Sequence, residues 1–231
     1  MKEIDSLIEQ QIEYYQARAL EYDEWFLRQG RYDRGLEHKK KWFDEVDQVR
    51  HSLDQFKPTG SVLEIACGTG LWTQQLLRCA QSITALDAVK EVLELNEKRL
   101  QSPRVKYIHA NIFNWQPEER YDVVFFSFWL SHVPPQYFEE YWKKVRQTLK
   151  PKGRVFFVDS KYEQTSTARD HELGEANAGT VKRLLNDGRD YRIVKIFYDC
   201  EELEKRLCRL GWDVKINETP SYFLFGSGGV N

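Results

Sequence analysis

Short apolar runs alternate with amphipathic patterns over most of the chain. The apolar runs that predict strands cover residues 62–66, 82–87, 105–110, 121–127, 154–159, 212–216 and 222–225. Between most of them, apolar residues recur at spacings of three and four, which indicates helices. Because strands that alternate with helices form parallel βαβ units, the sequence predicts an α/β fold with a doubly wound sheet.

The segments around this alternating pattern differ from it. Residues 1–58 precede the first strand and are expected to form an N-terminal helical cap, with one amphipathic pattern over 4–15 and another over 43–56. The predicted core occupies residues 59–231. Within it, residues 160–191 are polar and weakly periodic, which is typical of a functional lid. The glycine-rich residues 226–229 are expected to be a frayed end.

Composition narrows the class of protein. The 231 residues suit one α/β domain with a lid, and a formal net charge of -2 argues against nucleic acid as a partner. No apolar run reaches the roughly 20 residues of a membrane span, and the first residues lack the apolar core of a signal peptide. We therefore expect a cytoplasmic protein without a membrane partner. The four cysteines lack metal-ligand spacing and predict no metal site.

Residues 61–73, SVLEIACGTGLWT, carry the clearest chemistry. An apolar run with one acidic residue, Glu64, leads into small residues around Gly68 and Gly70, and helical spacing begins at Leu71. A strand, a glycine turn and a helix in this order let backbone N–H groups approach a ligand at the helix N-terminus. A Cβ at either glycine would block the ligand or strain the turn.

This segment resembles the first motif of class I S-adenosylmethionine-dependent methyltransferases, acidic-x-Gly-x-Gly-x-Gly, with Ala66 in place of the first glycine. Residues 14–23, YYQARALEYD, are similar to a Tyr-x-x-Arg-Ala-x-x-Tyr-Asp segment that many members carry as a cap over the cofactor. The resemblance covers residues 10–226 and is strongest over 61–159. It implies a Rossmann-like sheet of about seven strands, the last of them antiparallel.

The same resemblance implies that the cofactor is S-adenosylmethionine and the product S-adenosylhomocysteine. Asp87 ends the second strand, 17 residues after Gly70, where a carboxylate suits both ribose hydroxyls. Asn111 stands where the family commonly has an acid, and its carbonyl oxygen can accept from the adenine amino group. Arg18 would pair with the methionine carboxylate. The predicted cofactor-binding residues are Tyr15, Arg18, Glu64, Ala66, Gly68, Gly70, Trp72, Asp87, Ala88, Asn111, Ile112 and Phe128.

Methyl transfer from a sulfonium is an in-line displacement, so positioning of the acceptor supplies much of the acceleration. Nucleobase and glutamine methyltransferases carry Asn/Asp-Pro-Pro-aromatic after the fourth strand, whereas this chain has SFWL at 127–130. We therefore expect a small-molecule acceptor. His132 is the candidate base, and the alternative is that its ring caps a helix or packs below Trp129. The predicted acceptor residues are Trp25, Arg28, Tyr32, Trp129, Tyr162 and Arg169.

Two other functions remain open on the sequence. A nicotinamide-dependent oxidoreductase would account for the glycine turn and Asp87, although Thr73 stands where a dinucleotide fingerprint needs Gly or Ala. A non-catalytic S-adenosylmethionine-binding partner protein would keep the cofactor pocket without an acceptor. Monomer and homodimer both remain open. We interpret the chain as a methyltransferase that acts on a small molecule.

Overall fold

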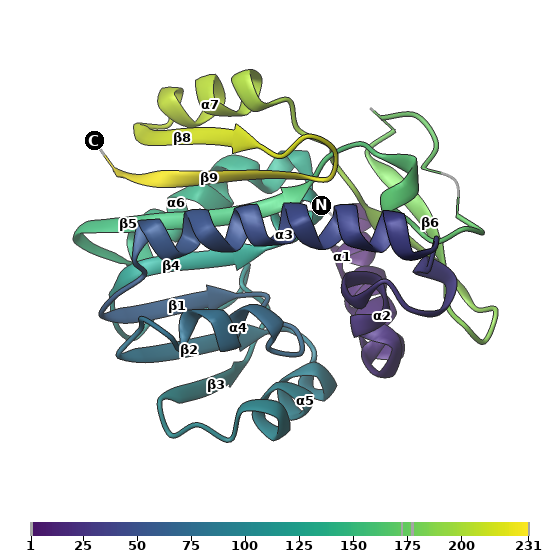
Figure 1. The fold of residues 1–231 in the computed structure, drawn as a ribbon. Helices are drawn as coiled ribbons and strands as arrows, with labels where there is room; N and C mark the ends of the chain where they lie inside the picture. The colour runs from purple at the N-terminus through teal and green to yellow at the C-terminus, as the bar shows by residue number, and fades with distance from the viewer. Residues whose placement is uncertain (1, 172, 177, 231) are drawn as a thin grey trace.

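A seven-stranded sheet organises the computed structural model, which describes residues 2–171, 173–176 and 178–230 (Figure 1). The strand order is β3-β2-β1-β4-β5-β9-β8. The strands are β1 (Ser61–Ile65), β2 (Ser82–Asp87), β3 (Val105–His109), β4 (Tyr121–Ser127), β5 (Leu149–Ser160), β8 (Trp212–Glu218) and β9 (Phe223–Val230). Strands β1 to β5 pair in parallel, and β9 inserts antiparallel between β5 and β8. The predicted α/β fold with an antiparallel last strand is confirmed.

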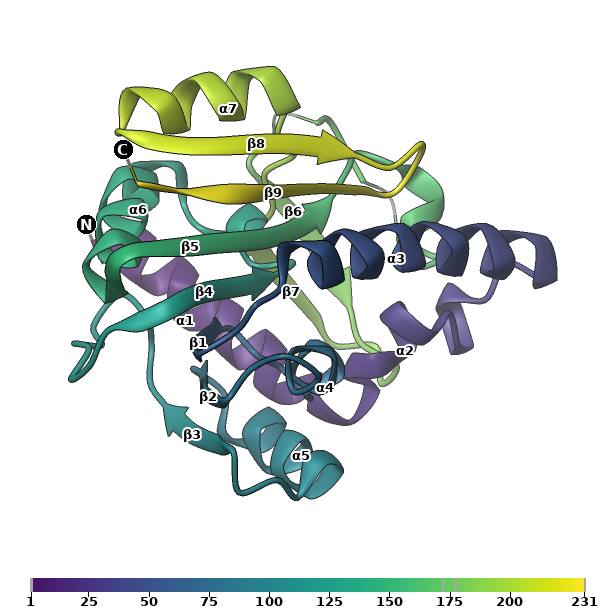
Figure 2. The same ribbon diagram turned by 60° about the vertical axis from the view of Figure 1, so that its left-hand side comes forward.

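Helices cover both faces of the sheet (Figure 2). They are α1 (Lys2–Ala17), α2 (Tyr22–Leu27), α3 (Leu36–Phe56), α4 (Leu71–Leu76), α5 (Lys90–Leu100), α6 (Phe138–Thr148) and α7 (Cys200–Arg209). One core lies under α6 and α7, and the other lies under α3 and α4. Successive residues of β4 point into opposite cores. Phe126 belongs to the core under α6 and α7, and Phe125 belongs to the core under α3 and α4. A strand buried on both faces needs apolar residues at consecutive positions, which explains the continuous apolar run of β4. None of the described helices combines the length and the apolar character that crossing a membrane requires.

The expected frayed end at residues 226–229 was wrong. These residues lie inside β9, paired with β5 on one side and β8 on the other. A Cβ at Gly226 would lie 2.5 Å from the ring of Phe157, and one at Gly228 would collide with the carbonyl oxygen of Asp213. Glycine is therefore needed here because neighbouring groups approach the backbone closely, and its presence does not signal disorder.

A small second sheet lies in the region predicted as a lid. Strands β6 (Thr180–Leu184) and β7 (Asp190–Val194) form an antiparallel hairpin, the lid hairpin, that the sequence analysis did not expect. Its apolar residues Val181, Leu185 and Ile193 pack against Tyr14 of α1. The hairpin therefore buries its apolar face on the N-terminal helix. The division into cap, core and lid stays a prediction.

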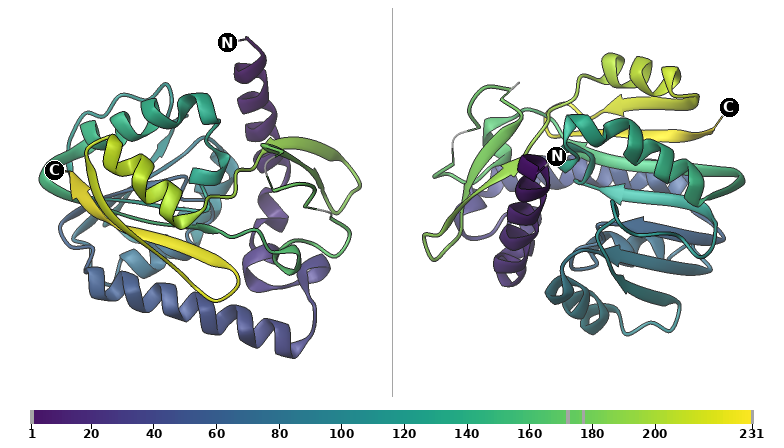
Figure 3. Two further views of the ribbon diagram at one scale, coloured as in Figure 1. Left: turned by 90° about the horizontal axis from the view of Figure 1, so that it is seen from above. Right: turned by 180° about the vertical axis from the view of Figure 1, so that it is seen from behind.

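Helices α1 and α2 and the lid hairpin lie together beyond the carboxyl ends of the parallel strands (Figures 1 and 3), whereas α3 runs along one face of the sheet. The strand order reverses between β1 and β4, since β2 and β3 lie on one side of β1 and β5 lies beyond β4. Ligands of open α/β sheets bind at such a reversal, outside the carboxyl ends of the strands. The fold therefore places the glycine turn after β1 in the crevice, with α1 and the hairpin above it.

Candidate active site

Two cavities share a wall at the carboxyl ends of the strands. The strand-tip cavity lies between α1 and the ends of β1 to β4, and Ile8, Gln11, Asp87, Asn111 and Ile112 are among its lining residues. The lid cavity lies between the cap and the lid, and Arg18, Trp25, Tyr32, Arg183 and Lys195 are among its lining residues. Six residues line both cavities and are called the junction here: Tyr15, Tyr22, Ala66, Ser127, Phe128 and His132.

The carboxylate of Asp87 is the charged group of the strand-tip cavity. Its Oδ2 accepts a hydrogen bond from the backbone N–H of Gly68 at 2.9 Å, and its Oδ1 accepts one from Val89 at 3.0 Å. Burial raises the pKa of Asp87 to about 6, against the opposing effect of these backbone donors. A backbone hydrogen bond from Ala88 also lowers the pKa of Asp87. A carboxylate has about four acceptor sites, so the side chain can still accept from a ligand.

Asn111 and Ile112 follow the end of β3 on the far side of the same cavity. The Oδ1 of Asn111 accepts from the backbone N–H of Phe113 at 3.0 Å, which closes an Asx turn. One lone pair of that oxygen and the amide N–H₂ remain for a ligand. The cavity therefore combines apolar walls with a few polar groups, which is typical of a site for a small organic ligand.

The glycine loop takes left-handed backbone conformations at three alternate residues. The φ angles are 54° at Ala66, 52° at Gly68 and 91° at Gly70, so Ala66 adopts the conformation for which glycine is commonly used. A Cβ at Gly68 would lie 2.9 Å from the hydroxyl of Tyr22, and one at Gly70 would lie 2.5 Å from Oδ1 of Asn96. Protein groups therefore occupy the space that a side chain would need at both glycines.

Tyr15 and His132 form a hydrogen-bonded pair at the junction. The ring nitrogen Nδ1 of His132 lies 2.6 Å from the carbonyl oxygen of Val194, and Nε2 lies 2.8 Å from the hydroxyl of Tyr15. A carbonyl oxygen can only accept, so Nδ1 carries the proton and Nε2 accepts from Tyr15. Burial, assisted by the charge of Lys195, holds the pKa of His132 well below its usual range. The imidazole is therefore neutral near pH 7.

Three basic side chains line the lid cavity. Lys195 lies 3.5 Å from the carboxylate of Asp159 and donates to the hydroxyl of Ser131 at 2.8 Å. Arg18 and Arg183 form no ion pair with any residue in the described ranges. Arg183 donates to the hydroxyl of Thr167 at 3.2 Å, and burial lowers its pKa from the ordinary value. Among the residues that the structure describes, the cavity is therefore cationic, and no described carboxylate pairs with either guanidinium group.

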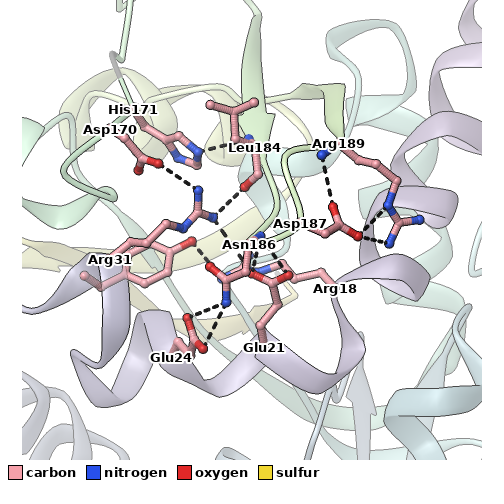
Figure 4. Close-up of polar contacts among 11 residues, drawn as sticks. Arg18, Glu21, Glu24, Arg31, Asp170, His171, Leu184, Asn186, Asp187 and Arg189 are labelled. Carbon is pink, nitrogen blue, oxygen red and sulfur yellow. Dashed lines mark hydrogen bonds and ion pairs between the residues drawn. The ribbon is translucent and has the colours of Figure 1, made fainter.

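The lid hairpin is fastened to the cap by polar contacts, which Figure 4 shows. Arg31 donates to the carbonyl oxygen of Leu184 at 2.5 Å and to Asp170 at 3.1 Å. Asn186, in the turn of the hairpin, donates from its backbone to Glu21 and from its side chain to Glu24, both at 3.1 Å. Contacts between residues far apart in the sequence thus hold the lid hairpin against the cap.

The structure distributes the predicted cofactor-binding residues over this site. Asp87, Ala88, Asn111 and Ile112 line the strand-tip cavity, Tyr15, Ala66 and Phe128 belong to the junction, and Arg18 and Trp72 line the lid cavity. Glu64, Gly68 and Gly70 are absent from the described walls of both cavities. Burial raises the pKa of Glu64 to about 8, with the nearby hydroxyl of Thr73 opposing the rise.

The predicted acceptor residues are divided as well. Trp25 and Tyr32 line the lid cavity and Trp129 lines the strand-tip cavity, whereas Arg28, Tyr162 and Arg169 are absent from the described walls of both. Arg28 is fully buried, with its guanidinium 3.6 Å from the ring centre of Trp42. Tyr162 is 48% exposed and donates to the carbonyl oxygen of Gly174 at 2.7 Å, and Arg169 is exposed.

Several residues that line the cavities were not among the predicted site residues, notably Tyr22, Ser127, Arg183 and Lys195. Tyr22 lay within the segment that resembles the family cap, so its position was a usable signal. Arg183 and Lys195 lie on or next to the lid hairpin. Val181, Arg183 and Leu185 are two residues apart, so an extended strand places their side chains on one face. That pattern could have predicted which side chains share a face, but it could not have predicted what the face contacts.

Comparisons with known proteins agree with this geometry. Residues 62–153 match a family model described as a methyltransferase domain. A solved complex of DhpI with SAH is 34% identical, with 97% of each chain covered and a TM-score of 0.80. A solved complex of DhpI with SAM and HEP is 36% identical, with 96% of each chain covered and a TM-score of 0.78.

A curated relative matches over a shorter stretch. The ubiquinone biosynthesis O-methyltransferase of Proteus mirabilis is 32% identical over 132 residues, which cover 53% of this chain and 52% of that protein. The chain thus corresponds to about half the length of that enzyme and to nearly all of DhpI.

Proposed function

Because the chain belongs to the S-adenosylmethionine-dependent methyltransferases, with which it shares its fold over almost its whole length, we propose that it methylates a small molecule that carries an anionic group. S-adenosylmethionine is the cofactor of this family, and DhpI has been solved with both SAM and SAH. Family membership also sets aside the nicotinamide-dependent oxidoreductase and the non-catalytic partner protein.

The strand-tip cavity fits the nucleoside part of the cofactor. The carboxylate of Asp87 would accept from the ribose hydroxyls, and the side-chain oxygen of Asn111 would accept from the adenine amino group. The backbone N–H of Ile112 would address a ring nitrogen. The methionine part then extends along the junction toward Arg18, whose guanidinium pairs with the carboxylate. These contacts are the roles that we propose for the predicted cofactor-binding residues.

One observation carries the proposal of an anionic acceptor. The lid cavity contains two guanidinium groups, Arg18 and Arg183, that have no carboxylate partner in the described part of the chain. The cofactor has one carboxylate, so it can neutralise only one of them. A partly buried charge that lacks a partner is costly, and an acidic group on the acceptor would stabilise Arg183. DhpI, which this chain matches over nearly its full length, has been solved with HEP beside SAM.

At the junction, the residues of this chain would orient the acceptor and exclude water. The bound cofactor supplies an activated methyl group. Tyr15 and Phe128 lie where the two cavities meet, so they would hold the acceptor against the reacting centre. An acceptor atom that is already ionised needs no base. For an acceptor hydroxyl, Tyr15 would take the proton while passing its own to Nε2 of the neutral His132.

The proposal can be tested with an acceptor panel. Small phosphonates, phosphates and carboxylates are incubated with the enzyme and S-adenosylmethionine, alongside neutral alcohols and amines of matched size, and formation of S-adenosylhomocysteine is measured. Turnover is expected with at least one class of anionic compound and not with its neutral counterpart. Efficient turnover of neutral amines or alcohols with none of the anions would contradict the proposal.

A further inference from the structure

We propose that Asn96 and Arg99 of α5 are positioning residues that hold the glycine loop in its cofactor-binding shape. Neither belongs to the described walls of the two cavities. They are three residues apart on one helix, so they lie on the same face of α5. That face contacts the loop at Gly68 and Thr69. The inference concerns the cofactor and does not depend on the identity of the acceptor.

Asn96 uses both of its side-chain polar atoms within the protein. It is fully buried, and its Nδ2 donates to the carbonyl oxygen of Gly68 at 3.2 Å and to the hydroxyl of Thr73 at 3.0 Å. Its Oδ1 accepts from the hydroxyl of Tyr107 at 3.1 Å. A side chain fully hydrogen-bonded in the interior has one defined orientation. Asn96 therefore links the loop, the start of α4 and β3 at one point.

Gly68 is consequently fixed from two sides. Its N–H donates to Asp87 at 2.9 Å and its carbonyl oxygen accepts from Asn96 at 3.2 Å. Because the φ angle of Gly68 is 52° and glycine is conformationally permissive, this residue would otherwise sample several conformations. The same asparagine also fills the space beside Gly70, where a Cβ would lie 2.5 Å from its Oδ1. Loss of the amide donor would release the peptide between Gly68 and Thr69, next to the proposed ribose-binding carboxylate.

Arg99 fixes the next residue of the loop and joins it to the cap. Its guanidinium donates to the carbonyl oxygen of Thr69 at 2.7 Å and pairs with the carboxylate of Asp23. The hydroxyl of Thr69 also donates to Asp23. Asp23 is adjacent to Tyr22, whose ring lies over Gly68. Arg99 therefore couples the conformation of the glycine loop to the position of α2.

The first experiment separates positioning from simple stability. Asn96→Asp keeps the acceptor for Tyr107 but replaces the donor to Gly68 with a carboxylate oxygen. The Kd for S-adenosylhomocysteine, measured by calorimetry, is expected to rise about tenfold or more. Val145→Ala, which removes buried methyl groups on α6, is the control, because it should lower the Tm while leaving that Kd unchanged. An Asn96→Asp protein that melts earlier but binds with the wild-type Kd would overturn the proposal.

The second experiment uses Arg99→Met, a change at a partly exposed position that is expected to fold, with the exposed neighbour Lys98→Met as its control. Hydrogen exchange is measured with and without S-adenosylhomocysteine. In wild type and Lys98→Met, the ligand should protect the amides of both the loop, residues 66–70, and the cap segment, residues 22–27. In Arg99→Met, protection of the cap segment should be lost and the Kd should rise severalfold. Unchanged protection of the cap together with an unchanged Kd would refute the role of Arg99.

Discussion

The strand-tip cavity and the lid cavity meet at six residues, yet they are built in different ways. The first takes most of its polar groups from the ends of neighbouring strands, between residues 65 and 132, with α1 as a cover. The second joins residues of the cap to residues of the lid more than 130 positions away. Local strand–turn–helix geometry can therefore specify the half that we propose for the cofactor, whereas the half that we propose for the acceptor requires tertiary contact between the cap and the lid.

The two cavities also differ in charge. The strand-tip cavity contains one carboxylate, Asp87, among mostly apolar walls, whereas the lid cavity contains Arg18, Arg183 and Lys195. Hydroxyl donors of a ribose suit the first, and an anionic acceptor suits the second. Substitutions on the two sides should consequently affect different kinetic and binding constants, which allows the comparison to be tested.

The largest effect is expected at the lid cavity. Arg183→Met should lower kcat/KM for an anionic acceptor, because the acidic group of the acceptor would lose its buried charge partner. The loss of transition-state stabilisation should be about 2–4 kcal/mol. The Kd for S-adenosylhomocysteine should change little. Lys182→Met, on the same strand and exposed, is the matched control. Equal losses in both variants, or a loss confined to cofactor affinity, would show that Arg183 does not face the acceptor.

A smaller effect is expected at the strand-tip cavity. Asp87→Ala should weaken binding of S-adenosylhomocysteine by about 1–3 kcal/mol, the cost of losing hydrogen bonds to a charged group. Calorimetry measures this directly. Unchanged affinity would show that Asp87 does not contact the cofactor. The carboxylate could then no longer explain a different ligand preference of the strand-tip cavity.

The pH dependence of cofactor binding sharpens the same point. Burial raises the pKa of Asp87 to about 6 in the free protein, and hydroxyl donors favour the ionised form. The full affinity for S-adenosylhomocysteine should therefore be observed above pH 6. As the pH drops through this value, the Kd should rise by at most about tenfold per pH unit. The measurement should cover pH 5 to 7. Glu64, whose pKa is about 8, stays mostly protonated over this range and does not add a second titration. Asp87→Asn should abolish the dependence.

The smallest effect is expected at Arg169. The sequence analysis placed this residue in the acceptor pocket, but the structure has it exposed and outside the described walls of both cavities. Arg169→Ala should change the activation free energy that corresponds to kcat/KM by less than about 0.5 kcal/mol, because substitutions at the surface commonly have small effects. A loss comparable to that of Arg183→Met would mean that the lid closes further when an acceptor binds.

The sheet could be predicted because strands and helices depend on local patterns, whereas the cofactor-binding roles came from the resemblance to the family and stay a prediction. Asp87 could be placed at a strand end from its apolar run alone, and the structure puts it beside the glycine turn. Arg28 illustrates the limit. It lies just beyond residues 14–23, which resemble the family cap, and it was predicted to line the acceptor pocket. A left-handed turn at φ 53° ends α2 there instead, and the side chain stacks on Trp42. Composition cannot predict such a reversal, since it depends on which groups are buried nearby.

The contacts of Asn186 with Glu21 and Glu24 bear on how this enzyme could acquire a new substrate. Partners that lie 165 and 162 positions apart in the chain must match for the hairpin to dock. A lid taken from a relative by recombination would arrive without its matching carboxylates, and it would seat poorly even if every residue facing the acceptor were suitable. Gradual exchange of side chains inside the existing enclosure is therefore the easier evolutionary route to altered specificity.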